Sequence, residues 1–351
     1  ATYSSNHTIV VEKSTLPVRT AEVIKTILYS VESNSNENKK SFEVLSNPEF
    51  LAEGTAINDL EKPDRVLIGG ESKEAMDALT RIYLNWVPKN KILHTNIWSS
   101  ELAKLTSNAF LAQRISSINS IAAICEATGA EVKEVSRAIG TDNRIGSKFL
   151  NSGPGFGGSC FKKDILNLVY LSKYFGLEEV ADFWESVVKL NNWHQHRISK
   201  LIVTSLYGTI TGKKICVLGF AFKADTNDTR ESSAINICKD LLDEGAILSI
   251  NDPKVTSDQI AKDLGLSETD IHNLEEGNWY FEENIDRGFE NADAVIILTE
   301  WDVYSKINWK EASKKMRKPG WVFDSRSIIP DKSLIGSELN LWRIGGGSRI
   351  K

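Results

Sequence analysis

Residues 214–251, KICVLGFAFKADTNDTRESSAINICKDLLDEGAILSIN, indicate the fold class of this chain. The apolar run over residues 214–222 predicts a buried strand. Asp228-Thr-Arg-Glu231 has the spacing of a capping box, which predicts a helix over residues 232–243. Residues 246–251 then predict the next strand. A strand, a helix and a further strand in succession are typical of an α/β domain.

The chain continues this alternation on both sides of that stretch. Apolar runs over residues 292–298 and 321–324 predict two more strands in the C-terminal part. In the N-terminal part, strands that alternate with helices indicate a parallel α/β sheet. Its elements are expected strands over residues 8–11, 43–45 and 65–68, and expected helices over 20–30 and 72–86, the second of which Ser72 can cap.

The middle of the chain is helical instead. Residues 99–128 are rich in alanine and apolar at helical spacing; Ser99 or Ser100 can cap the start of this helix, and Gly129 lies at its end. The fold class is therefore α/β, with two α/β domains joined by a long-helix central domain. Further helices are expected over 132–138, 163–174 and 178–205; the expected domain bounds are 1–98, 99–208 and 209–344, followed by a tail over 345–351 that we expect to be disordered.

The composition is that of a globular protein with several domains. The 351 residues are 41% hydrophobic and 25% charged, and the formal net charge of −5 argues against a dedicated nucleic-acid or membrane-surface binder. Four cysteines without a C-x-x-C pair indicate a reducing compartment, so we expect a cytoplasmic protein. The sequence contains no run of 18 apolar residues that would predict a membrane span, and residues 1–7 lack the regions of a signal peptide.

The strongest local signal is the glycine-rich run Gly153–Cys160, GPGFGGSC, followed by FKKD. Glycines allow the backbone to approach a ligand closely. Cys160 then lies at the start of a helix, where exposed N–H groups and the helix dipole favour a thiolate. Asp164 is four residues further on, on the same helical face, and a thiolate with a nearby carboxylate suits covalent catalysis followed by activation of water. A buried structural thiol after a flexible loop is the alternative that these residues leave open.

Two further pairs of polar residues are candidates. Lys104 and Asn108 are four residues apart on the long helix, so both project from one face. A solvated polar face is the alternative for this pair. Glu49 and Glu53 flank an apolar tripeptide that follows a proline. A turn with two exposed acids is the alternative there.

The remaining local patterns are less specific. The run Gly219–Lys223 follows a strand and resembles a phosphate-facing loop, but it is not a G-x-G-x-x-G turn. His194 and His196 face different ways on one helix and have no third ligand, so no metal site is predicted. The other cysteines, which lie in apolar patterns and are interpreted as core thiols, are Cys125, Cys216 and Cys238.

Taken together, these segments resemble the UDP-glucose dehydrogenase family, of the eukaryotic type. The match runs in order over nearly the whole chain, and the combination of motifs is more specific than any one of them. The motifs that carry it are EKST at 12–15, SNPEFLAEG at 46–54, WSSELAKLTSN at 98–108, NRIG at 143–146, GFGGSC at 155–160, GFAFK at 219–223 and DTRES at 228–232.

The resemblance implies an N-terminal Rossmann-like domain for NAD, a C-terminal Rossmann-like domain for UDP, and a central helix used in homodimerisation. It implies that UDP-glucose is oxidised in two steps at C6 to UDP-glucuronate with two NAD⁺, through a thiohemiacetal and a thioester on Cys160. The implied catalytic residues are Cys160 as nucleophile, Lys104, Asn108 and Asp164 around the sugar C6, and Glu49 and Thr15 in thioester hydrolysis.

The resemblance also implies a set of binding residues. Within it, Arg144 would reach the nucleotide sugar of a neighbouring subunit. The implied substrate-binding residues are Glu49, Phe50, Leu51, Ala52, Glu53, Lys104, Asn108, Arg144, Phe149, Asn151, Phe156, Gly157, Phe222, Lys223 and Arg326, and the implied cofactor-binding residues are Ser14, Thr15, Leu16, Glu53, Cys160, Phe161, Lys162, Lys163 and Arg230.

Two features depart from the family pattern. The family begins with a strand, a G-x-G-x-x-G turn and an acidic residue for the ribose, whereas this chain opens at what resembles a late strand of that domain. We therefore expect an incomplete first domain, and a fragment of a longer enzyme with weakened NAD affinity. Asn151 stands where eukaryotic members usually carry a lysine. The alternatives are a sister dehydrogenase acting on UDP-N-acetylmannosamine or GDP-mannose, and an inactive UDP-sugar-binding module.

Overall fold

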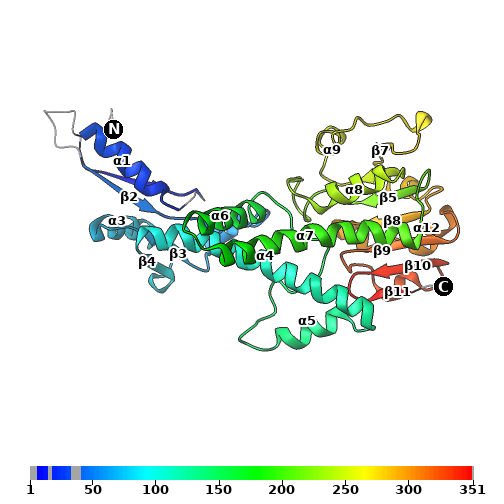
Figure 1. The fold of residues 1–351 in the computed structure, drawn as a ribbon, viewed down its shortest axis with the longest axis horizontal. Helices are drawn as coiled ribbons and strands as arrows, with labels where there is room; N and C mark the ends of the chain where they lie inside the picture. Colours follow the sequence, from blue (N-terminus) through cyan, green and yellow to red (C-terminus); the bar gives the residue numbers. More distant parts are fainter. Residues whose placement is uncertain (1–5, 15–17, 33–40, 350–351) are drawn as a thin grey trace. The chain divides into compact units, whose positions relative to one another are not determined.

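The structure, a computed structural model, describes residues 6–14, 18–32 and 41–349. The chain divides into two compact units, Ala1–Ala109 and Phe110–Lys351 (Figure 1). Among the described residues, no helix combines the length and the apolar character needed to cross a lipid bilayer.

The first unit contains a four-stranded sheet in the order β1-β2-β3-β4. The parallel pairs β1–β2 and β3–β4 confirm the expected α/β pattern. β2 and β3 meet in antiparallel fashion at Ser46 and Gly69. Residues 47–65, which include the short helix α2, connect these two strands. The elements are β1 (Thr8–Glu12), α1 (Thr20–Glu32), β2 (Phe42–Ser46), α2 (Ala56–Glu61), β3 (Val66–Gly69), α3 (Lys73–Tyr83), η1 (Lys89–Lys91) and β4 (Ile92–Thr95).

The first unit has buried clusters on both faces of the sheet, one toward α3 and one toward α1. Leu45 of β2, Ile68 of β3 and Tyr83 of α3 belong to one buried cluster. The predicted cap of α3 is confirmed, because the Ser72 hydroxyl accepts a hydrogen bond from the backbone N–H of Ala75 at 3.2 Å. The sequence pattern missed β4, because two of its four residues are exposed and it contains no apolar run.

A single long helix, α4 (Ile97–Thr128), begins in the first unit and ends in the second. The long helix is confirmed, and Gly129 follows it with a φ of 79°, the left-handed conformation expected after a helix. The predicted caps Ser99 and Ser100 are wrong, because the helix begins two residues earlier than Ser99. The side-chain oxygen of Asn96 accepts the Ser99 N–H at 2.7 Å, so Asn96 supplies the cap.

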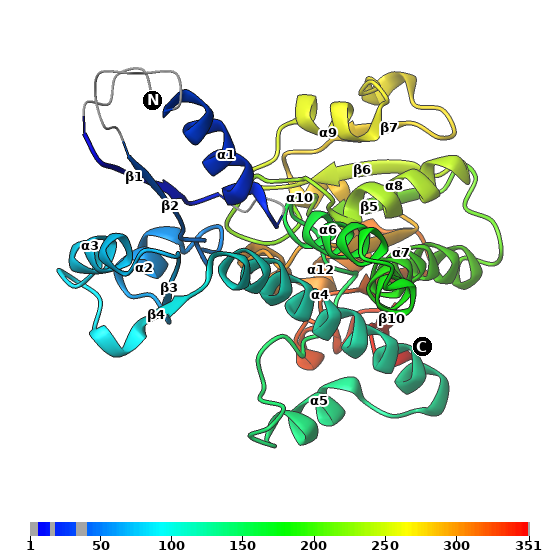
Figure 2. The same ribbon diagram turned by 60° about the vertical axis from the view of Figure 1, so that its left-hand side comes forward.

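The helices that follow α4 agree with the sequence pattern to within two residues at each end. α6 and α7 lie side by side in both ribbon views (Figures 1 and 2). The short link between α6 and α7 folds them back on each other as neighbours. The helices are α5 (Val132–Gly140), α6 (Phe161–Tyr174) and α7 (Glu178–Ser205).

The rest of the second unit is built on a seven-stranded sheet in the order β11-β10-β9-β8-β5-β6-β7. All neighbouring strands are parallel except β10 and β11. The central strands β8 and β9 are buried along their whole length, as expected for a parallel sheet covered on both faces. The strands are β5 (Lys214–Leu218), β6 (Ile247–Asn251), β7 (Trp279–Phe281), β8 (Ala294–Ile297), β9 (Gly320–Asp324), β10 (Leu339–Arg343) and β11 (Gly347–Arg349), and the helices are α8 (Ser233–Asp243), α9 (Ser257–Leu264), η2 (Ile271–Asn273), α10 (Ile285–Gly288), α11 (Asp302–Ser305), α12 (Trp309–Lys315) and η3 (Asp331–Leu334).

Two predictions for this part are wrong. The expected disordered tail contains β11, which pairs with β10 between Arg349 and Leu341. Backbone pairing with an existing edge orders this glycine-rich segment, which has little apolar side chain of its own. The expected capping box does not begin α8. Ser232 is the cap, and its hydroxyl accepts the Ala234 N–H at 3.3 Å.

Candidate active site

The glycine-rich loop over residues 153–160 is held by buried polar side chains of α4 and α7. Asn191 of α7 accepts the Phe156 N–H at 2.9 Å and donates to the Phe156 carbonyl at 3.2 Å. Asn119 of α4 accepts the Gly153 N–H at 2.9 Å. These bonds satisfy the backbone of a buried loop that no sheet or helix ladder could satisfy. The loop therefore has one defined conformation.

His194 contributes the remaining anchor of this loop. Its Nε2 lies 2.9 Å from the Gly153 carbonyl oxygen, which can only accept, so Nε2 carries the hydrogen. Burial, and then the charge of Arg197, lower the pKa of His194 to about 4. His196 instead pairs with Asp240 on the exposed side of the helix. The two histidines thus have separate structural partners, and among the described residues no three His, Cys, Asp or Glu side chains are grouped so that they could hold a metal ion.

Two glycines of the loop are required by close contacts. Gly155 has a φ of 136°, and a Cβ at that position would lie 2.8 Å from the Asn191 Oδ1. A Cβ at Gly157 would lie 2.6 Å from the Glu231 carbonyl oxygen and 2.9 Å from the Phe222 Cβ. The loop therefore packs directly against the segment that follows β5, and only glycine allows that approach.

Cys160 is the residue immediately before α6, and its side chain is exposed. The Asp164 N–H donates to the Cys160 carbonyl at 2.9 Å, which starts the helix at this point. The predicted position of the thiol at a helix start is therefore confirmed, and the alternative of a buried structural thiol is wrong. Asp164, one turn further on, is fully buried, so the thiol and the carboxyl group have different environments.

The other three cysteines are buried, which confirms their interpretation as core thiols. Burial raises the pKa of Cys216 to about 12 and raises the pKa of Cys238 as well. Both thiols are therefore protonated at neutral pH and shielded from any reactant. Cys160 is the one cysteine of the chain with an exposed side chain.

Arg326 links the loop after β5 to the glycine-rich loop. Its Nε donates to the Leu298 carbonyl at 2.7 Å, its Nη2 donates to the Phe222 carbonyl at 3.0 Å, and its guanidinium pairs with Glu300. The Gly153 backbone lies against the same guanidinium, because a Cβ built at Gly153 would lie 3.4 Å from the Arg326 Nη1. The structure thus brings together four predicted substrate-binding residues: Phe156, Gly157, Phe222 and Arg326.

A cavity of about 630 Å³ opens beside these residues, within the size range of small-molecule sites. Arg326 and the predicted Asn151 line it, and so do Lys133, Ser136 and Arg137 of α5. The sequence pattern did not identify the three α5 residues. The available signal was their spacing of three and four, which places them on one helical face. Three cations and one acid, Glu300, give the lining a net positive charge that suits an anionic ligand.

In the first unit, the ring of Phe50 lies close to two cations. The Arg65 guanidinium is 3.6 Å from the ring centroid, and the Lys104 ammonium is 5.3 Å from it. Lys104 and Asn108 are each only 7% exposed. The alternative of a solvated polar face is therefore wrong for this pair. Arg65 was missed, because a lone arginine before a strand carries no pattern.

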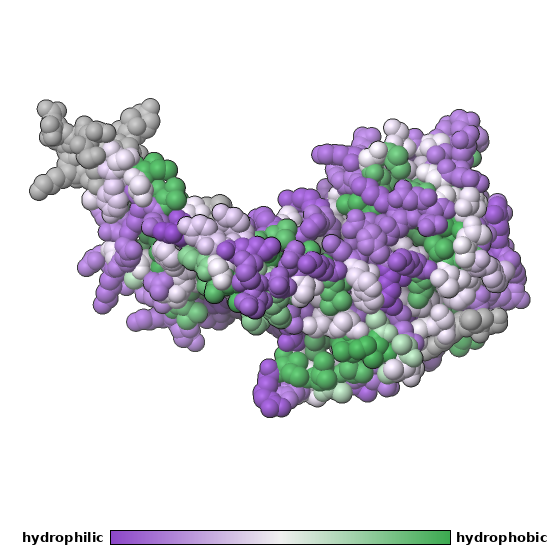
Figure 3. Space-filling view, viewed as in Figure 1, coloured by the Kyte–Doolittle hydropathy of each residue, from purple (hydrophilic) through white to green (hydrophobic). Residues whose placement is uncertain are grey.

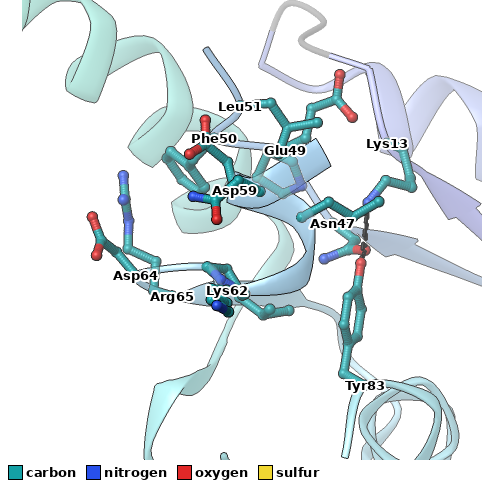
Figure 4. A pocket seen from close by; sticks show the side chains of 15 residues that line it. Lys13, Asn47, Glu49, Phe50, Leu51, Asp59, Lys62, Asp64, Arg65 and Tyr83 are labelled. Carbon is teal, nitrogen blue, oxygen red and sulfur yellow. Dashed lines mark hydrogen bonds between the residues drawn. The ribbon is translucent and has the colours of Figure 1, made fainter. Parts of the chain in front are cut away.

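A second cavity, of about 210 Å³, contains a hydrogen-bonded triad (Figure 4). Tyr83 donates to the Asn47 Oδ1 at 2.6 Å, and the Lys13 ammonium lies 3.3 Å from the same oxygen and 3.0 Å from the Tyr83 hydroxyl. Asn47 in turn donates to the Leu67 carbonyl at 2.7 Å. The triad fixes the start of the segment that carries the predicted residues Glu49, Phe50 and Leu51, which also line this cavity.

Glu12 ends β1 and is buried. Burial, and then the nearby Glu101 carboxylate, raise the pKa of Glu12 to about 7. Glu101 accepts the Arg19 and Ala21 N–H groups at 2.7 and 3.0 Å. Within the described part of the chain, the Glu12 Oε2 has no hydrogen-bond partner. A buried polar atom therefore lies at the carboxyl edge of a parallel strand pair, the edge where nucleotides bind in open α/β sheets.

The other predicted residues have individual positions. Arg144 pairs with Asp142 at 2.6 Å and is 89% exposed. Lys162 pairs with Glu231 at 2.8 Å, and Arg230 pairs with Asp228 at 2.7 Å. Thr15 and Leu16 lie outside the described residues. Of the remaining predicted residues, Ser14 and Glu53 are exposed, and Phe149 is 41% exposed with a φ of 62°. The others are Leu51, Ala52, Phe161, Lys163 and Lys223.

The two α/β sheets, the anchored glycine-rich loop and the exposed cysteine at a helix start define a nucleotide-binding α/β enzyme with a candidate thiol nucleophile. Three domains of the UDP-glucose/GDP-mannose dehydrogenase family match the sequence: the NAD binding domain over residues 1–87, the central domain over 98–193 and the UDP binding domain over 216–331. The chain belongs to the UDP-glucose/GDP-mannose dehydrogenase family. It is an NAD-dependent dehydrogenase, and the predicted family and cofactor are confirmed.

Individual relatives agree with this assignment. A UDP-glucose 6-dehydrogenase of Caenorhabditis elegans is 53% identical over 351 residues, which cover 98% of this chain and 72% of the relative. A UDP-glucose 6-dehydrogenase of Gallus gallus is 53% identical, over 93% of this chain and 66% of the relative. A solved UDP-glucose dehydrogenase of Pyrobaculum islandicum is 29% identical with a TM-score of 0.81, over 98% of this chain and 72% of that one. The predicted fold class is confirmed.

Proposed function

We propose that this chain carries the catalytic and UDP-sugar-binding parts of a UDP-glucose 6-dehydrogenase, with Cys160 as its nucleophile. The observation that supports this most directly is the position of Cys160. It is the exposed cysteine of the chain, and it follows an anchored glycine-rich loop at the start of a 14-residue helix. Helix N-termini stabilise a thiolate, which is the nucleophilic form of cysteine.

The carboxyl edge of β1 fits the cofactor. The buried Oε2 of Glu12 has no partner among the described residues, and a ribose hydroxyl or a carboxamide would supply one. When bound, NAD⁺ accepts a hydride in each of the two oxidations. Among this chain's residues, the proposed cofactor set comprises Ser14, Thr15, Leu16, Glu53, the Cys160–Lys163 segment and Arg230.

The proposed reaction has two oxidations and one hydrolysis. C6 of UDP-glucose first gives up a hydride and a proton and becomes an aldehyde. The Cys160 thiolate adds to the aldehyde carbon, and protonation of the oxygen gives a thiohemiacetal. Loss of a second hydride and proton gives a thioester. Water then cleaves the C–S bond, which releases the carboxylate of UDP-glucuronate and restores the thiol.

The other proposed catalytic roles follow from charge and burial. Lys104 supplies a cation with little freedom to move, suited to an oxygen that gains negative charge. Asp164 is a buried carboxyl group one turn into α6, suited to accept a proton from water. Asn108 would hold the sugar, and Glu49 and Thr15 would assist hydrolysis.

For the nucleotide, we propose the cavity beside Arg326. Its cations Lys133, Arg137 and Arg326 would attract a diphosphate, and Ile115 and Leu150 offer an apolar wall for a base. We prefer UDP-glucose as the substrate over UDP-N-acetylmannosamine and GDP-mannose, because the relatives that share 53% identity are UDP-glucose 6-dehydrogenases. A solved UDP-N-acetylmannosamine dehydrogenase from Pyrococcus horikoshii shares only 24% identity and informs the fold alone.

We also propose a homodimer through the central helices. Phe110 of α4 is 56% exposed, and its ring lies 5.7 Å from that of Trp184, which contacts the 53% exposed Phe183. The face in Figure 3 is mostly hydrophilic, with a hydrophobic patch over α5. Exposed apolar clusters such as that of Phe110, Phe183 and Trp184 mark association surfaces. Sedimentation of the chain and of Phe110→Glu tests the proposal, and a chain that sediments as a monomer at micromolar concentration would contradict it.

The nucleophile can be tested without turnover. Brief treatment with iodoacetamide at neutral pH should add one adduct, on Cys160, and excess UDP-glucose should slow that addition. Cys160→Ser should remove the adduct and keep UDP-glucose binding by calorimetry, while Cys125→Ser, a buried control, should keep both. Equal labelling with and without UDP-glucose would refute a substrate site at Cys160. Labelling of a different cysteine would refute the nucleophile.

The complete reaction needs a second measurement. Calorimetry with UDP-glucose and with NAD⁺ separates an enzyme from an inactive UDP-sugar-binding module, because only the enzyme also binds NAD⁺. Where turnover is measurable as NADH absorbance, Glu49→Gln should slow hydrolysis. The acyl adduct on Cys160 should then accumulate and appear in intact-protein mass spectra. Loss of turnover without an adduct would assign Glu49 to another step.

A further inference from the structure

The turn after β5 has an internal anion at the position where a Rossmann-like domain commonly binds phosphate. Phe220 and Ala221 point their N–H groups at one oxygen of Asp252, at 2.7 and 3.0 Å. Asp252 directly follows β6, the neighbouring parallel strand. A carboxylate of the chain itself therefore occupies the donors that a bound phosphate would otherwise take.

The Asp252 carboxylate is fully used. The same oxygen, Oδ2, also accepts from the Trp301 indole at 3.2 Å. Its other oxygen accepts from the Lys254 and Val255 N–H groups at 2.8 and 3.0 Å. The residue is buried, and every one of these partners is a donor. An asparagine of the same shape would turn its NH₂ group toward donors in either orientation, so only a carboxylate satisfies the site.

The carbonyl side of the turn is held as firmly as its N–H side. The Ser232 hydroxyl donates to the Phe220 carbonyl at 2.8 Å, and the Thr299 hydroxyl donates to the Ala221 carbonyl at 2.6 Å. Arg326 holds the next carbonyl, as described above. The turn therefore has fixed partners on both sides, and Asp252 is the side chain that holds its Phe220 and Ala221 N–H groups at the end of β6.

We propose that Asp252 is a positioning residue for the UDP-sugar. It closes the turn with an internal carboxylate, so that the turn presents Phe222 and Lys223 to the nucleotide instead of binding phosphate through its own backbone. Phe222 is the residue that packs against Gly157 and Gly158 of the glycine-rich loop. This inference rests on the proposed function, which assigns Phe222 and Lys223 to UDP-sugar binding.

The test is a double-mutant cycle read by calorimetry with UDP and with UDP-glucose. Asp252→Asn should raise the Kd of both ligands about tenfold or more, where each factor of ten equals about 1.4 kcal/mol. Lys223→Met should also raise the Kd. The double variant should bind more tightly than the product of the two single effects predicts, because Lys223 is one of the two residues through which Asp252 acts. If the Kd increases of the two single variants multiply in the double variant, Asp252 acts elsewhere and the proposal is overturned. Unchanged binding by Asp252→Asn would also overturn it.

Asp293→Asn is the matched control. Asp293 also accepts a backbone N–H of β5, from Lys214 at 2.9 Å, but at the opposite end of that strand. The Asp293→Asn substitution should lower the melting temperature and leave the Kd for UDP-glucose within about twofold of that of the unmodified chain. An increase equal to that of Asp252→Asn would mean that any damage to β5 weakens binding, and would overturn the positioning role.

Hydrogen exchange decides the question if Asp252→Asn does not fold. In the unmodified chain, the Phe220 and Ala221 amides should be protected without ligand and gain no protection when UDP is added. Amides that exchange freely and become protected only with UDP would show that phosphate, not Asp252, is their partner. Failure of the unmodified chain to bind UDP-glucose would refute the proposed function itself and this inference with it.

Discussion

Protonation of His194 should destabilise the second unit at mildly acidic pH. The imidazole is 1% exposed, and its Nε2 hydrogen is committed to the Gly153 carbonyl. Protonation places a hydrogen on Nδ1, which has no acceptor in the described part of the chain. The cost of an unsatisfied buried charge explains why the pKa of His194 lies near 4 rather than at the ordinary value of 6.5.

The sign and size of the effect follow from this difference. Between pH 6.5 and pH 4 the unfolded chain takes up a proton that the folded chain refuses, so the free energy of unfolding falls as the pH falls. A pKa difference of roughly 2.5 corresponds to about 3 kcal/mol across this window. Above pH 6.5 both states are neutral at this position, and the contribution of His194 no longer changes.

Urea unfolding of the unmodified chain and of His194→Gln, measured every half unit from pH 4 to pH 8, tests this reasoning. Gln retains a donor for the Gly153 carbonyl but does not titrate, so the difference in unfolding free energy between the two should shrink by about 3 kcal/mol as the pH falls. His196→Asn, an exposed change on the same helix, should retain the pH dependence assigned to His194. Parallel curves for the unmodified chain and His194→Gln would refute a buried neutral imidazole.

Three other changes have defined outcomes. Asn191→Ala leaves the buried N–H and carbonyl of Phe156 without partners, so urea unfolding should show a loss of about 2–4 kcal/mol; a loss below 1 kcal/mol would mean that water replaces the side chain. Gly157→Ala should weaken UDP-glucose binding in calorimetry by about tenfold, because the new Cβ would lie 2.6 Å from the Glu231 carbonyl oxygen. Gly208→Ala, where the new Cβ meets open space, should bind UDP-glucose normally. The folded state retains the Glu12 proton between pH 4.5 and pH 7, so Glu12 lowers the free energy of unfolding as the pH rises through this window. Glu12→Gln should remove this contribution, and an unchanged slope in urea unfolding would contradict the raised pKa.

The sequence predicted best the elements whose signals are local. The glycine run before Cys160 and the apolar helical spacing after it were enough to place the thiol at a helix start, and the structure agrees. Apolar runs likewise located β5, β8 and β9. Four strands, β4, β7, β10 and β11, escaped prediction. Of these, β4 and β11 are stabilised by pairing with a neighbouring strand more than by side-chain burial.

Burial of polar residues was the main property that the sequence pattern did not reveal. Lys104 and Asn108 suggested a solvated face because helical spacing states which side chains share a face and not what covers it. Their burial follows from the unit around them, where the Phe50 ring lies beside the Lys104 ammonium. The α5 cations Lys133 and Arg137 were missed for the converse reason: they are exposed, as on any charged helical face, and only the cavity beside them gives them a candidate role.

The polar run of α7 shows how such residues can be interpreted. Asn191, His194 and Gln195 are nearly fully buried in the middle of a long helix, where an unsatisfied polar group would cost about 1–3 kcal/mol. Asn191 and His194 hydrogen-bond the backbone of the glycine-rich loop, and Gln195 donates to Ser233 at 3.1 Å. Helix backbone groups are already paired, so polar side chains on a buried helical face must find partners in irregular backbone or in other side chains. The loop before Cys160 needs those partners, because glycines that permit close approach to a ligand supply no side chains to hold themselves in place.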